Sequence, residues 1–197
     1  ELGWRGVNCF VAEKSKTLNP HPRANAVANR TMEYYRRWKI DKAITDAGVP
    51  PDHLADYYWV SSLYGKELHR MSLPPFEKIR EVSDKNGQLR KEHSWSPYLK
   101  TITGQNEVEK AILNYVRSLD SVEYKFDHKL VDFEQDEDGV KSLVENLVTG
   151  EVETYRSQYL IACDGGRSSI REKLGISLLG RPNLANFVSI YFKFSSI

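Results

Sequence analysis

The chain has 197 residues, with 28 Lys or Arg against 27 Asp or Glu, so its formal net charge is +1. This length suits one or two domains and is enough to bury a hydrophobic core. The balanced charge leaves no overall field that would attract nucleic acid or an anionic membrane. The apolar runs are too short to cross a bilayer, and no signal peptide opens the chain. We therefore expect neither nucleic acid nor membrane among its partners.

The two cysteines, Cys9 and Cys163, both lie in apolar runs typical of strands. This placement favours reduced, buried thiols in a cytoplasmic protein, with a disulfide as the less favoured alternative. The histidines have no metal-ligand spacing, so we assign none of them to a metal site or to catalysis. They are His21, His53, His69, His93 and His128.

Both ends of the chain suggest a piece of a longer protein. The opening residues ELGWRG are typical of the last turn of a helix with Gly6 as its cap, and a strand is predicted over residues 7–12. The closing residues FVSIYFKFSSI stop within a β-branched and aromatic run. We expect further sequence on both sides.

The middle of the chain predicts helices separated by a hairpin. A helix over about residues 27–47 should end at Gly48 and the two prolines that follow. Mixed alternation over 57–72 indicates a hairpin that turns at Tyr64-Gly65-Lys66, and residues 74–97 are expected to be loop with short strands. Helical spacing then predicts a helix within 103–119, whose apolar face is formed by Val108, Ile112, Val116 and Leu119.

The last part of the chain predicts a β-meander followed by one more apolar strand. The turns are expected at Asp136-Glu137-Asp138-Gly139 and at Thr149-Gly150-Glu151. The apolar run Tyr159–Cys163 follows. Parallel-type apolar strands, helices and a meander together indicate an α/β fold with a β-rich portion.

A carboxylate follows each of two predicted apolar strands. Glu13 comes after the first strand, and Asp164 comes after residues 159–163 and before Gly165-Gly166. In dinucleotide-binding folds, ligands bind outside the carboxyl ends of the strands, where an acid accepts hydrogen bonds from ribose hydroxyls. Two such acids therefore favour a shared nucleotide. The alternatives are a solvated Glu13, and an Asp-Gly turn leading into a helix capped by Ser168.

Three segments resemble one enzyme family. The segment CDGGRSSIREKLGI (163–176) resembles the D-G-x-x-S-x-x-R signature of the FAD-dependent aromatic hydroxylases, the single-component flavin monooxygenases typified by p-hydroxybenzoate hydroxylase and phenol hydroxylase. The segment 11–40, with PRA and RTME, is similar to the family's region after its first ribose-binding acid, and TGQNEVEKAIL (103–113) is similar to its helix that starts with a flavin-contacting Gln. Residues 55–97 and 177–197 match weakly.

The resemblance implies a Rossmann-like FAD-binding domain, incomplete here, with a β-meander, plus part of a mixed β-rich substrate domain. Residues 1–55 and 98–176 would form the FAD-binding domain, without its N-terminal Gly-rich βα unit. Residues 56–97 and 177–197 would be parts of the substrate domain.

The resemblance also implies cofactor-binding residues. Glu13 would bind the adenosine ribose of FAD, with Lys14 beside it. Arg23 would lie near the flavin or the pyrophosphate, and Gln105 would reach the ribityl chain or the pyrophosphate. Asp164 would touch the cofactor, close to where NAD(P)H docks.

The activity implied is hydroxylation of a small aromatic, usually phenolic, substrate with FAD, NAD(P)H and O₂ through a flavin hydroperoxide. The cofactor would carry this chemistry, so no catalytic residue is identified from the sequence and no metal is expected. We expect the 197 residues alone to bind FAD weakly and to be inactive; a homodimer is compatible with the sequence. Two alternatives stay open: another FAD-fold enzyme, such as a halogenase or an isoprenoid-chain reductase, or a non-catalytic remnant that acts by contact with a partner.

Overall fold

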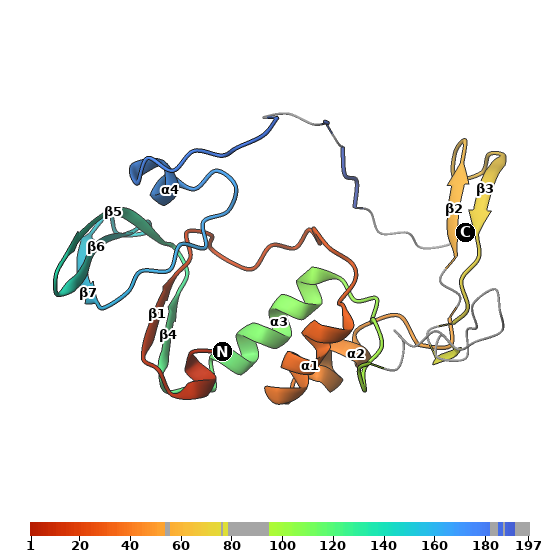
Figure 1. Ribbon diagram of the computed structural model, residues 1–197, viewed down its shortest axis with the longest axis horizontal. Helices are drawn as coiled ribbons and strands as arrows, with labels where there is room; N and C mark the ends of the chain where they lie inside the picture. Colours follow the sequence, from red (N-terminus) through yellow and green to blue (C-terminus); the bar gives the residue numbers. More distant parts are fainter. Residues whose placement is uncertain (54–55, 76, 79–94, 182–184, 187, 192–197) are drawn as a thin grey trace. The chain divides into compact units, whose positions relative to one another are not determined.

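The computed structural model describes residues 1–53, 56–75, 77–78, 95–181, 185–186 and 188–191. The chain divides into two compact units, one formed by residues 1–9 and 18–123 and the other by residues 10–17 and 124–197. Figure 1 gives the order of the elements. These units reflect packing rather than function, so the predicted FAD-binding and substrate domains stay a prediction.

The N-terminal turn is helical, as predicted. A short 3₁₀ helix, η1 (Gly3–Arg5), ends at Gly6, whose φ of 76° lies in the left-handed region. The Gly6 amide donates to the Gly3 carbonyl at 2.9 Å. Glycine adopts this conformation without steric cost, and this is why the chain can leave the helix here.

The predicted single helix over residues 27–47 is wrong, because the structure has two helices in its place. Helix α1 (Asn29–Arg37) and helix α2 (Asp41–Asp46) are separated at Lys39, whose φ is 59°. The Ile40 amide donates to the Tyr35 carbonyl at 2.9 Å, as in a helix ended by a left-handed residue. The break buries Ile40 in the core, so packing explains why a helix of favourable residues stops here.

The hydrophobic core of the first unit joins α1, α2 and helix α3 (Gln105–Val116). The predicted apolar face of α3 is confirmed at Val108, which is buried, and at Ile112, which packs against the core. The hairpin prediction is also confirmed: strand β2 (Tyr57–Val60) pairs antiparallel with strand β3 (Glu67–Met71), and both are exposed. The buried members of the core are Val27, Met32, Tyr35, Ile40, Ile44 and Val108.

Strand β1 (Cys9–Ala12) pairs with strand β4 (Val122–Lys125). The Cys9 amide donates to the Ser121 carbonyl at 2.8 Å, and the Glu13 amide donates to the Lys125 carbonyl at 2.9 Å. Both partners advance in the same direction along the chain, so the pair is parallel. Parallel strands need a crossover between them, and here it contains α1, α2 and α3.

The predicted meander is confirmed. Strands β5 (His128–Asp136), β6 (Gly139–Asn146) and β7 (Val152–Ser157) form one antiparallel sheet in that order. Gly139 closes the β5–β6 turn, and Gly150 lies in the β6–β7 turn with a φ of 76°. Alternate residues of β6 are buried, as expected of a strand with one covered face: Val140, Ser142 and Val144.

The predicted buried strand Tyr159–Cys163 is wrong. The segment forms no helix or strand, and Tyr159 and Ile161 are 82% and 65% exposed. A strand needs a neighbour for its amides and carbonyls, and no strand among the described residues pairs with this segment. Cys163 is exposed as well, so the prediction of two buried thiols is wrong; Cys9 is half-buried. Both cysteines are free, as predicted.

Candidate cofactor site

In the first unit, the PRA segment lies beside the start of α3. Gly104 caps α3, and the amide of Gln105, its first residue, donates to the Ala24 carbonyl at 2.8 Å. This bond brings together Arg23 and Gln105, two predicted cofactor residues that are far apart in the sequence. The Gln105 side chain donates to Glu109 at 2.6 Å. Arg23 is exposed, and its guanidinium has no partner among the described residues, so it is available to an anion.

A cavity of about 280 Å³ opens next to this junction. Its walls are mainly small and apolar, with Ala24, Ala26 and Val108 among them, and no charged side chain of the described residues lines it. Polar side chains come from Thr31 and Tyr35 on α1, from Gln105 at the start of α3, and from Thr103. A mostly apolar hollow with a few placed polar groups is the usual form of a small-molecule site.

Tyr35 is suited to donate a hydrogen bond to a ligand in this cavity. Its side chain is 8% exposed, and its hydroxyl has no hydrogen-bond partner within the described part of the chain. Burial raises the pKa of the phenol above its ordinary value, so the group is a neutral donor at physiological pH. The hydroxyl oxygen is not among the fully buried atoms of the described residues that lack a partner, so it is accessible to solvent or to a ligand. An accessible donor at a mostly apolar hollow suits an acceptor group of a ligand.

In the second unit, Glu13 and Lys14 follow β1, at the position where the sequence predicts a ribose-binding acid. The backbone of Glu13 is held on both sides, because its amide donates to Lys125 and its carbonyl accepts from His128 at 3.0 Å. One carboxylate oxygen of Glu13 accepts from the Ser15 amide at 2.8 Å. The other oxygen has no partner in the described ranges and can accept a ligand hydroxyl. Lys14 is exposed.

Asp164 lies before helix α4 (Ser169–Lys173). A turn at residues 166–167 follows it and leads into the helix, which Ser168 caps, as the alternative interpretation of this segment predicted. The Asp164 carboxylate accepts from the Ile170 amide at 3.3 Å, and a hydrogen bond from Ser168 lowers its pKa below the ordinary value. Gly165 has a φ of 80°. Arg171 donates to the Gly166 carbonyl at 2.8 Å. Asp164 thus stabilises a capped turn, and its contact with a cofactor stays a prediction.

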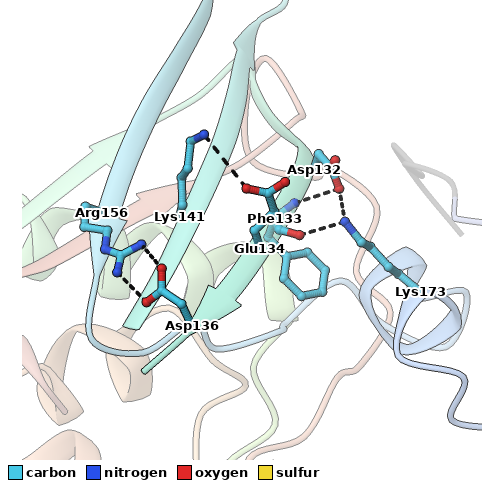
Figure 2. A network of polar contacts seen from close by, with 7 residues as sticks. All are labelled: Asp132, Phe133, Glu134, Asp136, Lys141, Arg156 and Lys173. Atoms are coloured by element: carbon cyan, nitrogen blue, oxygen red, sulfur yellow. Dashed lines mark hydrogen bonds and ion pairs between the residues drawn. The ribbon is translucent and has the colours of Figure 1, made fainter. Parts of the chain in front are cut away.

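Lys173 holds α4 against the β5–β7 sheet, as Figure 2 shows. Its ammonium group donates to the Phe133 carbonyl at 2.7 Å and to the Asp132 carboxylate, and it lies 4.8 Å from the centre of the Phe133 ring. The pairing register of β5 shifts between Leu130 and Asp132. Such a shift re-aims side chains at a sheet edge.

Sequence reasoning missed two of these residues. Tyr35 lies in an ordinary helical motif, where an aromatic residue predicts core, and its hydroxyl alone hints at a polar role. Lys173 contacts residues of β5 that are distant in sequence, so no local pattern could identify it. Among the described residues, no group of three His, Cys, Asp or Glu could hold a metal ion. Within the same residues, no helix is long and apolar enough to span a bilayer.

Comparisons with known proteins identify the family of the chain. A family model described as FAD binding domain matches residues 1–196. Tetracenomycin A2 monooxygenase-dioxygenase from Streptomyces glaucescens is 30% identical over 98% of this chain and 34% of its own length. For 2,4-dichlorophenol 6-monooxygenase from Cupriavidus pinatubonensis, the identity is 28% over 95% of this chain and 30% of its own length. The chain thus spans about a third of the length of these relatives.

Solved structures show the same fold. The flavin-dependent monooxygenase PieE, in complex with FAD and substrate, has a TM-score of 0.80 at 28% identity, covering 93% of this chain and 30% of that chain. The substrate-free rebeccamycin biosynthetic enzyme RebC has a TM-score of 0.71 at 29% identity, covering 88% of this chain and 31% of that chain. These matches confirm the predicted α/β FAD-binding fold and the resemblance to flavin monooxygenases. Since the family model spans nearly every residue, the chain belongs to the FAD binding domain family.

Proposed function

We propose that the protein carrying this chain is a FAD-dependent monooxygenase that uses NAD(P)H and O₂ to hydroxylate a small aromatic, phenolic substrate. The observation that carries this proposal is the junction of Arg23 and Gln105 beside a mostly apolar cavity. The printed activities of the relatives, a dichlorophenol monooxygenase among them, support the aromatic substrate class. We place the protein in the cytoplasm because both of its cysteines are free thiols.

Each residue that the family resemblance identifies suits a particular part of FAD. Arg23 offers an unpaired positive charge that suits the pyrophosphate, while the uncharged cavity beside Gln105 suits the flavin and its ribityl chain. The free carboxylate oxygen of Glu13 suits a ribose hydroxyl, with Lys14 next to it. Asp164 would contribute from the turn before α4.

Bound FAD would supply the reaction with reducing equivalents taken from NAD(P)H and with the activation of O₂. The part of the chain described here would bind and orient the cofactor. Residues 1–55 and 98–176 would form the FAD-binding domain, and residues 56–97 and 177–197 would belong to the substrate domain. The 197 residues alone should bind FAD weakly and show no turnover, because they span about a third of the relatives' length.

The test uses the complete polypeptide that carries this sequence. The purified protein should bind FAD and couple NAD(P)H oxidation to a hydroxylated product from a panel of phenols. Arg23→Ala should weaken FAD binding about 10- to 100-fold, since a charge-assisted hydrogen bond is worth roughly 1.5–3 kcal/mol. Arg117→Ala is the matched control, because this exposed arginine lies at the opposite end of α3 from Gln105.

Three outcomes would contradict parts of the proposal. Absence of FAD from the complete protein would reject it altogether. FAD binding without any hydroxylated product would favour the halogenase or isoprenoid-chain reductase alternatives. Equal FAD affinities for Arg23→Ala, Arg117→Ala and the unchanged protein would reject the assignment of Arg23 to the cofactor site.

A further inference from the structure

Helix α1 contributes two hydroxyl-bearing residues to the cavity wall, one turn apart. Thr31 and Tyr35 are separated by four residues, so they lie on the same face of the helix, and both line the cavity. The hydroxyl groups of both have no hydrogen-bond partner among the residues that the structure describes. Thr103, another lining residue, differs because its hydroxyl donates to the Ile44 carbonyl at 3.0 Å.

Tyr35 is the more informative of the two because it is buried. Its ring belongs to the core of the first unit and lies 5.9 Å from the ring of Trp38. Phenylalanine would fill the same core position without a hydroxyl to satisfy. A tyrosine that packs in the core and also lines the cavity therefore combines core packing with a hydroxyl donor that an occupant of the cavity could meet.

The cavity indicates what the acceptor is. No charged side chain of the described residues lines it, so a phosphate group would find no counter-charge inside. Its alanine and valine walls suit an uncharged, flat or slender group that carries hydrogen-bond acceptors. The carbonyl oxygens and ring nitrogens of the flavin ring meet this description, and so do the hydroxyls of the ribityl chain.

We propose that Tyr35 donates a hydrogen bond from the core of the first unit to an uncharged acceptor in the flavin or ribityl portion of FAD. Thr31 lines the same wall one turn earlier. This inference rests on the proposed FAD-binding function. It adds Tyr35 as a recognition residue, to which the family resemblance assigns no contact.

The test compares Tyr35→Phe with Tyr34→Phe in the complete polypeptide that carries this sequence. Tyr34 is the matched control: it is the neighbouring tyrosine of α1, it does not line the cavity, and its hydroxyl lies 3.5 Å from the Arg30 guanidinium. FAD affinity is measured by quenching of flavin fluorescence, and the absorption spectrum of bound FAD is recorded. Tyr35→Phe should weaken FAD binding about 3- to 10-fold, as expected for loss of one neutral hydrogen bond. Tyr34→Phe should leave the affinity unchanged.

The outcomes separate the inference from the proposed function. A weaker affinity with a shifted flavin absorption band would place the acceptor on the ring, and a weaker affinity with an unchanged band would place it on the ribityl chain; both support the inference. If the unchanged protein binds FAD and Tyr35→Phe matches it in affinity and spectrum, the inference is overturned while the proposed function stands. If the unchanged protein binds no FAD, the proposed function fails first. Melting of the flavin-free variants checks folding, and removing an unpaired hydroxyl should not lower the melting temperature.

Discussion

The substitution Ile44→Ala should destabilise the unit that contains the cavity. Ile44 lies on α2 and is 0% exposed. It packs in the same core as Tyr35 and Val108, two residues that also wall the cavity. Truncation of a fully buried Leu or Ile to Ala costs about 2–5 kcal/mol, since apolar contacts are lost and a void remains. Helix α2 has six residues and is too short to be stable without packing, so we expect about 3–4 kcal/mol.

The assay is urea unfolding followed by tryptophan fluorescence, because Trp38 packs against this core and reports on it. The matched control is Leu63→Ala, whose side chain is 77% exposed and whose loss should change stability by no more than about 0.5 kcal/mol. Because the chain has two compact units, a single free energy of unfolding is assigned only if the transitions seen by fluorescence and by circular dichroism coincide. A cost for Ile44→Ala below about 1 kcal/mol would refute the view that this core supports the cavity walls.

Two further predictions concern the second unit. Gly139→Ala should cost about 1–3 kcal/mol of unfolding free energy in the same urea assay, because φ is 135° and a Cβ atom would lie 2.3 Å from the Ser157 carbonyl oxygen; a neutral result would contradict the turn geometry. Lys173→Met should increase amide hydrogen exchange throughout α4, because it removes the contacts to Asp132 and Phe133; unchanged exchange would show that other contacts hold the helix. The Lys173 hydrogen bond lowers the pKa of Asp132, so its stabilisation is present above the ordinary aspartate pKa and is lost as the pH falls through the lowered value. The protection factors of the α4 amides, which correct for the intrinsic pH dependence of exchange, should therefore fall in acid, and Asp132→Asn should remove that change in protection.

Sequence patterns predicted the elements whose causes are local. Helix α3 has apolar residues at helical spacing, and the turn at Gly139 carries a residue that accepts the required backbone. The break between α1 and α2 has no such sign, because Lys39 adopts a left-handed φ where glycine is usual. What stops α1 is the gain from burying Ile40 and Ile44 in a core formed with α3, which is a tertiary effect.

The residues of the candidate site also differ in whether a local sequence pattern predicts them. Arg23 and Gln105 were predicted from short motifs, and their proximity comes from a single backbone hydrogen bond between the two motifs. Tyr35 could not be assigned from the sequence, because its ring satisfies the helical pattern whether or not its hydroxyl has a partner. Only the cavity beside it distinguishes the two cases.

The segment before Asp164 shows where pattern and pairing differ. An apolar run indicates residues that prefer burial, but a strand also requires a neighbouring strand to pair with, and the run itself does not specify that neighbour. The exposed Tyr159 and Ile161 therefore keep the predicted apolar character without the predicted strand. The following Asp-Gly-Gly turn forms through contacts of its own, with the Asp164 carboxylate accepting from α4 and Ser168 capping it. Since these contacts lie within the chain, the motif identifies a backbone geometry, and the Asp164 carboxylate has a structural contact with the Ile170 amide whether or not a cofactor binds. Loss of FAD affinity in Asp164→Asn would thus demonstrate binding only if hydrogen exchange shows that α4 stays capped.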